Sequence, residues 1–108
     1  MKKYVFIRLS FDALHNWEGC NLDEVNYLKY MHRHIFFVEM WWNISHDDRD
    51  IEFISKKMEV ETFIDNNWRG RYLKNMSCEM LASRLMEEFN ADKVYVSEDN
   101  ENGAIIEK

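Results

Sequence analysis

Apolar and polar residues alternate with the period of a β-strand at both ends of the chain. In residues 2–11 one face is purely apolar and is expected to cover the core; it carries Val5, Ile7, Leu9 and Phe11. Residues 32–46 predict a longer strand with apolar side chains on both faces. We expect helices to cover one of these faces and another subunit to cover the other. Residues 12–31 between them predict a loop. Two short strands are predicted over residues 93–98 and 104–107.

Helical spacing replaces this alternation in the middle of the chain. Apolar residues recur every three or four positions from about residue 49 to 66, and Asp47 or Asp48 can cap this helix. A second helix begins at Ser77, with Glu79 suited to its first turn through the helix dipole. The predicted order is therefore strand, strand, helix, helix, strand, strand, an α+β arrangement.

Composition narrows the class of protein. A chain of 108 residues with 46% hydrophobic and 31% charged residues is expected to form one folded domain over residues 1–108. A net charge of -6 argues against binding to the nucleic-acid backbone. No secretory signal and no apolar run long enough to span a bilayer are visible. Two cysteines are too few for a disulfide framework, so we expect a cytoplasmic protein without membrane or nucleic-acid partners.

Two histidines open the long predicted strand. His32 and His34 project from the same face, because side chains on a strand alternate with period 2. Neighbouring imidazoles can share a metal ion, and His15, in the predicted loop before this strand, is the candidate third ligand. Three neutral imidazoles with one open position describe a catalytic zinc site. The alternative is two unconnected strand histidines, because such pairs are common on strands.

Six short motifs give the chain a resemblance to a known family over nearly its whole length. They are Phe11–His15, His32–Phe36, Asp50–Phe53, Phe63–Asn67, Asn75–Glu79 and Val94–Glu98. In this order they resemble motifs of the 6-pyruvoyl- and 6-carboxy-tetrahydropterin synthases. The resemblance implies a T-fold, in which a four-stranded antiparallel sheet (ββααββ) with two helices on one face closes by association into a barrel. It also implies a homo-oligomer, a trimer or hexamer, with sites at subunit interfaces.

The resemblance also implies roles for particular residues. Zinc held by the three histidines binds side-chain hydroxyl groups of a dihydroneopterin triphosphate and, as a Lewis acid, eases the removal of nearby protons. Glu98 accepts hydrogen bonds from the pterin amino group and ring N–H, an edge that guanine also offers. Glu79 and Ser77 complete the implied pocket. Outside the family frame, Glu98 is a solvated carboxylate before a turn and Glu79 a partner of the helix dipole.

The groups that transfer protons in the family are altered here. Family members carry a cysteine four to six residues before the histidine pair, whereas the only cysteine in this loop is Cys20, twelve residues before His32. A segment of roughly residues 23–31, folded aside, would deliver Cys20 to the zinc; otherwise Cys20 is an ordinary loop cysteine. Asp65 is present, but Asn66 replaces the histidine of the family's relay, and asparagine does not transfer protons near neutral pH.

Three functions are consistent with this mixture of retained and altered residues. The first is a zinc-dependent carbon–oxygen lyase or synthase acting on a reduced pterin or a related purine-like nucleotide, with Cys20 and Asp65 catalytic. The second is a non-catalytic protein that captures a pterin or purine nucleotide in the same pocket. The third is a structural oligomer in which zinc only steadies the loop. Cys78 is interpreted as a packing residue.

Overall fold

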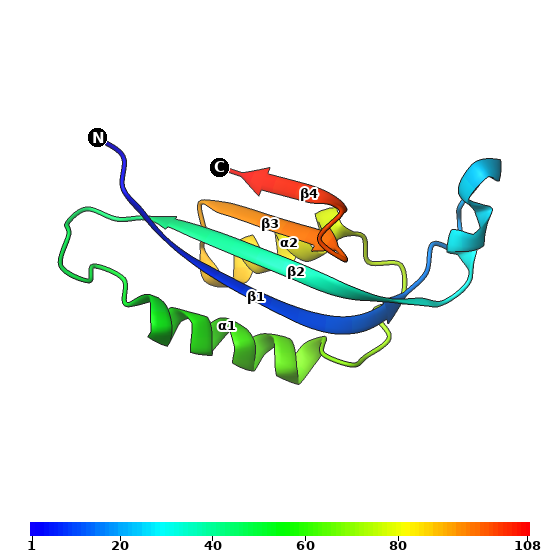
Figure 1. Cartoon of the computed structure of the whole chain (residues 1–108), viewed down its shortest axis with the longest axis horizontal. Coiled ribbons are helices and arrows are strands. Elements are labelled where there is room, and N and C mark those ends of the chain that lie inside the picture. The colour runs from blue at the N-terminus through cyan, green and yellow to red at the C-terminus, as the bar shows by residue number, and fades with distance from the viewer.

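The computed structural model describes all 108 residues, which form a long antiparallel sheet covered on one face by two helices (Figure 1). The strands are β1 (Tyr4–His15), β2 (His32–Asn43), β3 (Lys93–Glu98) and β4 (Asn102–Glu107), and they lie in the order β1-β2-β3-β4. The helices are α1 (Phe53–Asn67) and α2 (Cys78–Phe89), with a short 3-10 helix, η1 (Asp23–Lys29), between β1 and β2. This confirms the predicted α+β class, the antiparallel four-stranded sheet and the order of its elements.

The core lies between the sheet and the two helices. We call the helix-covered face of the sheet the inner face and the opposite one the outer face. The predicted apolar face of β1 is the inner one, and Ile7, Leu9 and Phe11 are buried there. Helix α1 buries Val60 and Ile64 against this layer. Burial of these side chains supplies the main driving force for the fold.

Helix α1 begins later than predicted and has a different N-cap. It starts at Phe53, and the carboxylate of Glu52 accepts hydrogen bonds from the backbone N–H groups of Ile54 and Ser55, both at 3.0 Å. Asp47 and Asp48 were predicted as caps, and this prediction is wrong. Both belong to an irregular segment that follows β2. Strand β2 ends at Asn43 rather than at the predicted residue 46.

The loop between α1 and α2 is tied to the end of β1. The N–H of Gly70 donates to the carbonyl of Asp12 at 2.7 Å, and the N–H of Leu73 donates to the carbonyl of Leu14 at 2.7 Å. The N–H of Leu14 in turn donates to the carbonyl of Arg71 at 2.9 Å. This pairing covers one edge of β1 near its C-terminal end and carries the chain past His15 toward the start of α2.

The outer face of the sheet is exposed and partly apolar. Phe6 is 43% exposed and stacks on Trp41 with ring centroids 5.4 Å apart, and Ile105 is 55% exposed. Arg8 and Glu39 form an ion pair across β1 and β2 at 2.8 Å. In the single chain nothing covers this face.

None of the helices has the length and apolar character needed to cross a membrane.

The assignment of the cap can be tested by substitution. Removing the Glu52 carboxylate leaves the N–H groups of Ile54 and Ser55 without their acceptor, so Glu52→Ala should unfold at a lower urea concentration than the wild type at pH 7. Asp48→Ala, which changes a carboxylate outside the helix, should leave the midpoint unchanged. Equal midpoints for the two variants would contradict the assignment.

The stabilisation by the Glu52 cap should depend on pH. The backbone hydrogen bonds from Ile54 and Ser55 hold the pKa of Glu52 below its ordinary value. The stabilisation by a group with a lowered folded pKa is present above its unfolded pKa, about 4.3, and is lost as the pH falls through the folded pKa. The difference between Glu52→Ala and wild type should therefore shrink in acid, as measured by urea unfolding at pH 7 and below pH 4.

Candidate metal centre

The pairing of β1 with β2 brings three histidines together on the inner face. His15 lies opposite His32, and Ala13 lies opposite His34. The ring centroid of His15 lies 4.5 Å from that of His32 and 5.3 Å from that of His34. His15 was predicted in a loop; it is instead the last residue of β1, because this strand continues four residues beyond the predicted end. The structure thus brings together the three predicted metal ligands.

A carboxylate joins this group from the next strand. Glu98, the last residue of β3, lies opposite Phe36 of β2 and points to the same face. One ligand atom from each of His15, His32, His34 and Glu98 lies within 4.8 Å of every other. Imidazole and carboxylate are ligands of several divalent transition metals. These four residues, which we call the His3Glu cluster, could therefore hold a metal ion.

The far ring nitrogen of each histidine is held by a hydrogen-bond acceptor. The pairs are His15 Nδ1 with the Met76 carbonyl at 2.8 Å, His32 Nδ1 with the Tyr30 carbonyl at 2.8 Å, and His34 Nδ1 with the Asp99 carboxylate at 2.7 Å. Each acceptor requires a proton on Nδ1, so in the neutral imidazoles the lone pair is on Nε2. Partners of this kind fix the ring orientation of metal-binding histidines. The cluster therefore has the tautomers that a metal site requires.

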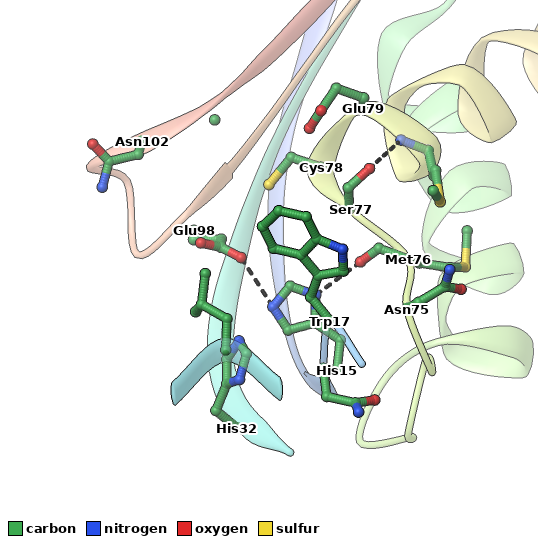
Figure 2. A pocket seen from close by; sticks show the side chains of 14 residues that line it. His15, Trp17, His32, Asn75, Met76, Ser77, Cys78, Glu79, Glu98 and Asn102 are labelled. Carbon is green, nitrogen blue, oxygen red and sulfur yellow. Dashed lines mark hydrogen bonds and ion pairs between the residues drawn. The ribbon is translucent and has the colours of Figure 1, made fainter. Parts of the chain in front are cut away.

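His15 and Glu98 lie in close contact without a well-directed hydrogen bond between them. His15 Nε2 is buried, and Glu98 Oε2 lies 2.9 Å from it, but the angles are not those of a hydrogen bond. Figure 2 shows the imidazole directed at the carboxylate from below, with its other nitrogen on the Met76 carbonyl. A buried nitrogen without a well-directed partner is costly, and a metal ion between these atoms would satisfy it. The residues at this point are therefore compatible with a metal ion.

The two groups shift each other's ionisation. Burial lowers the pKa of His15, but its contacts with Glu98 and the Met76 carbonyl outweigh burial and leave the pKa raised. His15 in turn holds the pKa of Glu98 below its ordinary value, against the opposing effect of burial. Without a metal, His15 therefore binds a proton more readily than an ordinary histidine.

Three members of the cluster, His15, His32 and Glu98, line a pocket of about 480 Å³. Two further residues predicted for the site, Ser77 and Glu79, also line it. The second helix was predicted to begin at Ser77, which is the N-cap of α2, and the Ser77 hydroxyl accepts a hydrogen bond from the N–H of Met80 at 3.2 Å. The other lining residues are Asn16, Trp17, Leu28, Asn75, Met76, Cys78, Met80, Asn102 and Gly103.

The two residues predicted as catalytic lie outside this pocket. Cys20 is buried within the β1–β2 connection, and its sulfur lies 3.6 Å from the carbonyl oxygen of Val25 and 3.8 Å from that of Leu22. The segment carrying η1 folds over the thiol instead of aside from it. Asp65 lies on the exposed part of α1 and pairs at 2.5 Å with Arg69, which follows the C-terminal end of this helix. Within one chain neither side chain reaches the cluster.

Cys78 is the cysteine that lines the pocket. It is buried, in agreement with its interpretation as a packing residue, and Figure 2 shows its sulfur on the side of Glu98. Burial, with smaller contributions from the charges of Glu98 and Glu79, raises the pKa of the Cys78 thiol to about 12. Cys78 is therefore a neutral thiol near pH 7 and not a ready nucleophile.

Sequence reasoning missed Asp99, which holds His34. Its backbone is left-handed, with φ of 56°, as is that of Asn100, with φ of 59°. Aspartate and asparagine tolerate this conformation better than most residues. The turn directs the Asp99 carboxylate back to His34 and to the N–H of Ile35, which donates to it at 3.1 Å. The one signal in the sequence is that a carboxylate directly follows Glu98, in the predicted turn.

Comparisons with known proteins support the fold and leave the function open. Neither the models of protein families nor the curated proteins include a match to this chain. Among solved structures, the crystal structure of the uncharacterized protein WS1659 from Wolinella succinogenes is similar with a TM-score of 0.86 and 11% sequence identity. The match covers 100% of this chain and 99% of the other. At this identity the similarity establishes a shared fold, which is an α+β architecture with a four-stranded antiparallel sheet.

Asp99 provides a test of the outer hydrogen bonds. Asp99→Asn keeps a residue that tolerates the left-handed turn but removes the charge that holds His34. Loss of such partners typically weakens metal binding by roughly 10–100-fold, and we expect a loss near the lower end, measured by competition with a chelator. Asp12→Asn, which changes a carboxylate paired with Arg33 on the outer face, is the control and should bind the metal as the wild type does. Equal affinities for both variants would contradict the role of Asp99.

The raised pKa of His15 predicts a pH dependence of metal binding. The protonated imidazole cannot bind a metal, so affinity should fall as the pH drops through the raised pKa of His15, by at least about tenfold per pH unit below it. Because this pKa is raised, the fall should begin at a higher pH than for an ordinary histidine. Calorimetric titrations in buffers of different ionisation enthalpy should show proton release on binding below this pKa. Constant affinity from pH 8 to pH 5.5 would contradict the prediction.

Proposed function

We propose that the His3Glu cluster is a zinc site and that the adjoining pocket binds a reduced pterin or a related purine-like molecule. The observation that carries this proposal is the convergence of three imidazole Nε2 atoms, each with its Nδ1 on an acceptor. Neutral imidazole and carboxylate are common zinc ligands. When bound, zinc supplies a Lewis acid beside the pocket.

The pocket offers groups that suit a flat polar ring. Trp17 and Leu28 provide apolar walls, while Glu79 and Asn102 provide polar groups. The two carboxylates that line the pocket, Glu79 and Glu98, can accept hydrogen bonds from adjacent amino and ring N–H groups, an edge that pterins and guanine share. This chemistry agrees with the ligand class that the resemblance to the tetrahydropterin synthases implies.

We further propose that the chain is a T-fold protein and assembles as a trimer or hexamer with pockets at subunit interfaces. The apolar outer face, the edge of β4 and the part of the β1 edge that lies before Asp12 support association, because exposed apolar patches and open strand edges favour contact with another chain. No lysine or arginine lines the pocket. A triphosphate would therefore have to find its cations on a neighbouring subunit.

Two functions use this pocket differently. In the first, the protein is a zinc-dependent carbon–oxygen lyase or synthase acting on a dihydroneopterin-triphosphate-like substrate. In the second, it captures the pterin or purine without converting it. The second is favoured by the positions of Cys20 and Asp65 outside the pocket and by the neutral state of Cys78. The first requires a proton-transfer group from another subunit or from the substrate-bound pocket itself.

Incubation of the zinc-loaded protein with 7,8-dihydroneopterin and, separately, with its triphosphate tests both candidates. Chromatography of the bound and free fractions should show retention of a pterin, and Glu79→Gln should weaken it by removing an acceptor in the pocket. A new product would establish turnover, while unchanged bound pterin would establish capture. Guanosine and GTP are included as purine probes. Binding of none of these molecules would contradict the proposed ligand class.

A further inference from the structure

Glu98 has an unusual set of neighbours for a carboxylate. Its side chain is 29% exposed, and its polar contacts are the imidazoles of His15 at 2.9 Å and His34 at 3.6 Å. No lysine or arginine pairs with it, so the two histidines are the basic groups in contact with its carboxylate. A partly buried charge without such partners is costly unless another cation binds it. The surroundings of Glu98 therefore indicate a place in the metal's own ligand set.

The distances agree with this place. Two ligand atoms that bind one zinc ion tetrahedrally at about 2.0–2.1 Å lie about 3.3 Å apart. Glu98 Oε2 lies 2.9 Å from His15 Nε2 and 3.6 Å from His34 Nε2, on either side of this value. The carboxylate therefore already has tetrahedral spacing from two of the three imidazoles, while the ligand atom of His32 lies within 4.8 Å of the others. A carboxylate that only approached a ligand in the pocket would not need this spacing.

The sheet fixes the carboxylate at this point. Glu98 pairs with Phe36 at the end of β3, and the next residue, Asp99, donates its N–H to the carbonyl of Ile35 at 2.7 Å. The carbonyl of Glu98 accepts the N–H of Glu101 at 3.0 Å, which closes the turn. Both flanks of Glu98 are held by backbone hydrogen bonds. Its side chain therefore projects from a fixed position on β3, opposite Phe36 of β2.

We propose that Glu98 is the fourth protein ligand and closes the metal centre in the ligand-free protein. This inference deepens the proposed function, because it rests on the same metal site. A centre closed by four protein ligands has no position for water. Glu98 cannot bind the metal through this oxygen and at the same time hold the edge of a ring. A ring ligand whose adjacent N–H groups donate to Glu98 therefore draws this carboxylate off the metal and opens a coordination position.

Cobalt(II) substitution combined with thiocyanate titration tests the closure without relying on activity. The Co(II)-loaded wild type should show the intense visible absorption of four-coordinate cobalt, and thiocyanate should not change it, because no position is free. Co(II)-loaded Glu98→Gln should change its spectrum on addition of thiocyanate, and its zinc affinity should be at least about tenfold lower by chelator competition. Glu101→Gln makes the same change at an exposed carboxylate in the same turn, and this control should behave as the wild type.

A second substitution guards against a change in fold. Glu98→Asp keeps the charge but shortens the side chain by one methylene, so it should also open the site to thiocyanate while retaining the circular dichroism of the wild type. A wild-type spectrum that responds to thiocyanate as the Glu98 variants do would overturn the inference. Failure of the wild type to bind cobalt or zinc would overturn it together with the proposed metal site. A closed centre in a protein that binds none of the pterin or purine probes would instead contradict only the proposed ligand class.

Discussion

The hydrogen-bond register between β1 and β2 is the constraint on which the candidate site depends. It places His15 opposite His32, and period-2 alternation then puts His34 on the same face. A slip of one residue would turn the side chains of one strand to the other face and would also expose Ile7, Leu9 and Phe11. The register is therefore fixed by burial along the length of the strands, and the histidine geometry at their end follows from it. The long apolar run of β1 and β2 thus serves both the core and the cluster.

The remaining parts of the site are held by connections rather than by regular elements. The loop that runs beside the end of β1 delivers the Met76 carbonyl to His15, and the left-handed turn after β3 delivers Asp99 to His34. Glu98 reaches the cluster through the pairing of β3 with β2. The loop before α2 and the end of β3 with its turn therefore meet the histidine strands at one end of the sheet, on the side of α2. Because the outer hydrogen bonds leave Nε2 free on each ring, the local backbone geometry determines the chemistry of the cluster.

The sequence predicted what depends on periodicity and missed what depends on loops. Alternation located the inner face of β1, and helical spacing with Ser77 located α2, because burial imposes these patterns directly. The cap of α1 was misplaced because several carboxylates in residues 47–52 satisfy the same local rule, and only the path of the chain selects Glu52. Asp99 and the Met76 carbonyl could not be identified, since a turn conformation and a backbone acceptor leave no pattern in the residue types. The position of Cys20 depends on how its loop folds, which spacing alone left open.

The central claim is that His15, His32, His34 and Glu98 hold one metal ion. The most direct measurement is the mass of the folded protein under non-denaturing conditions after incubation with zinc and removal of the excess. We predict one zinc ion per chain in the wild type and none in His34→Ala, while His46→Ala, which changes an exposed histidine paired with Asp50, should retain the ion. A wild-type protein that remains free of zinc although correctly folded, or a His34→Ala variant that retains it, would contradict the account.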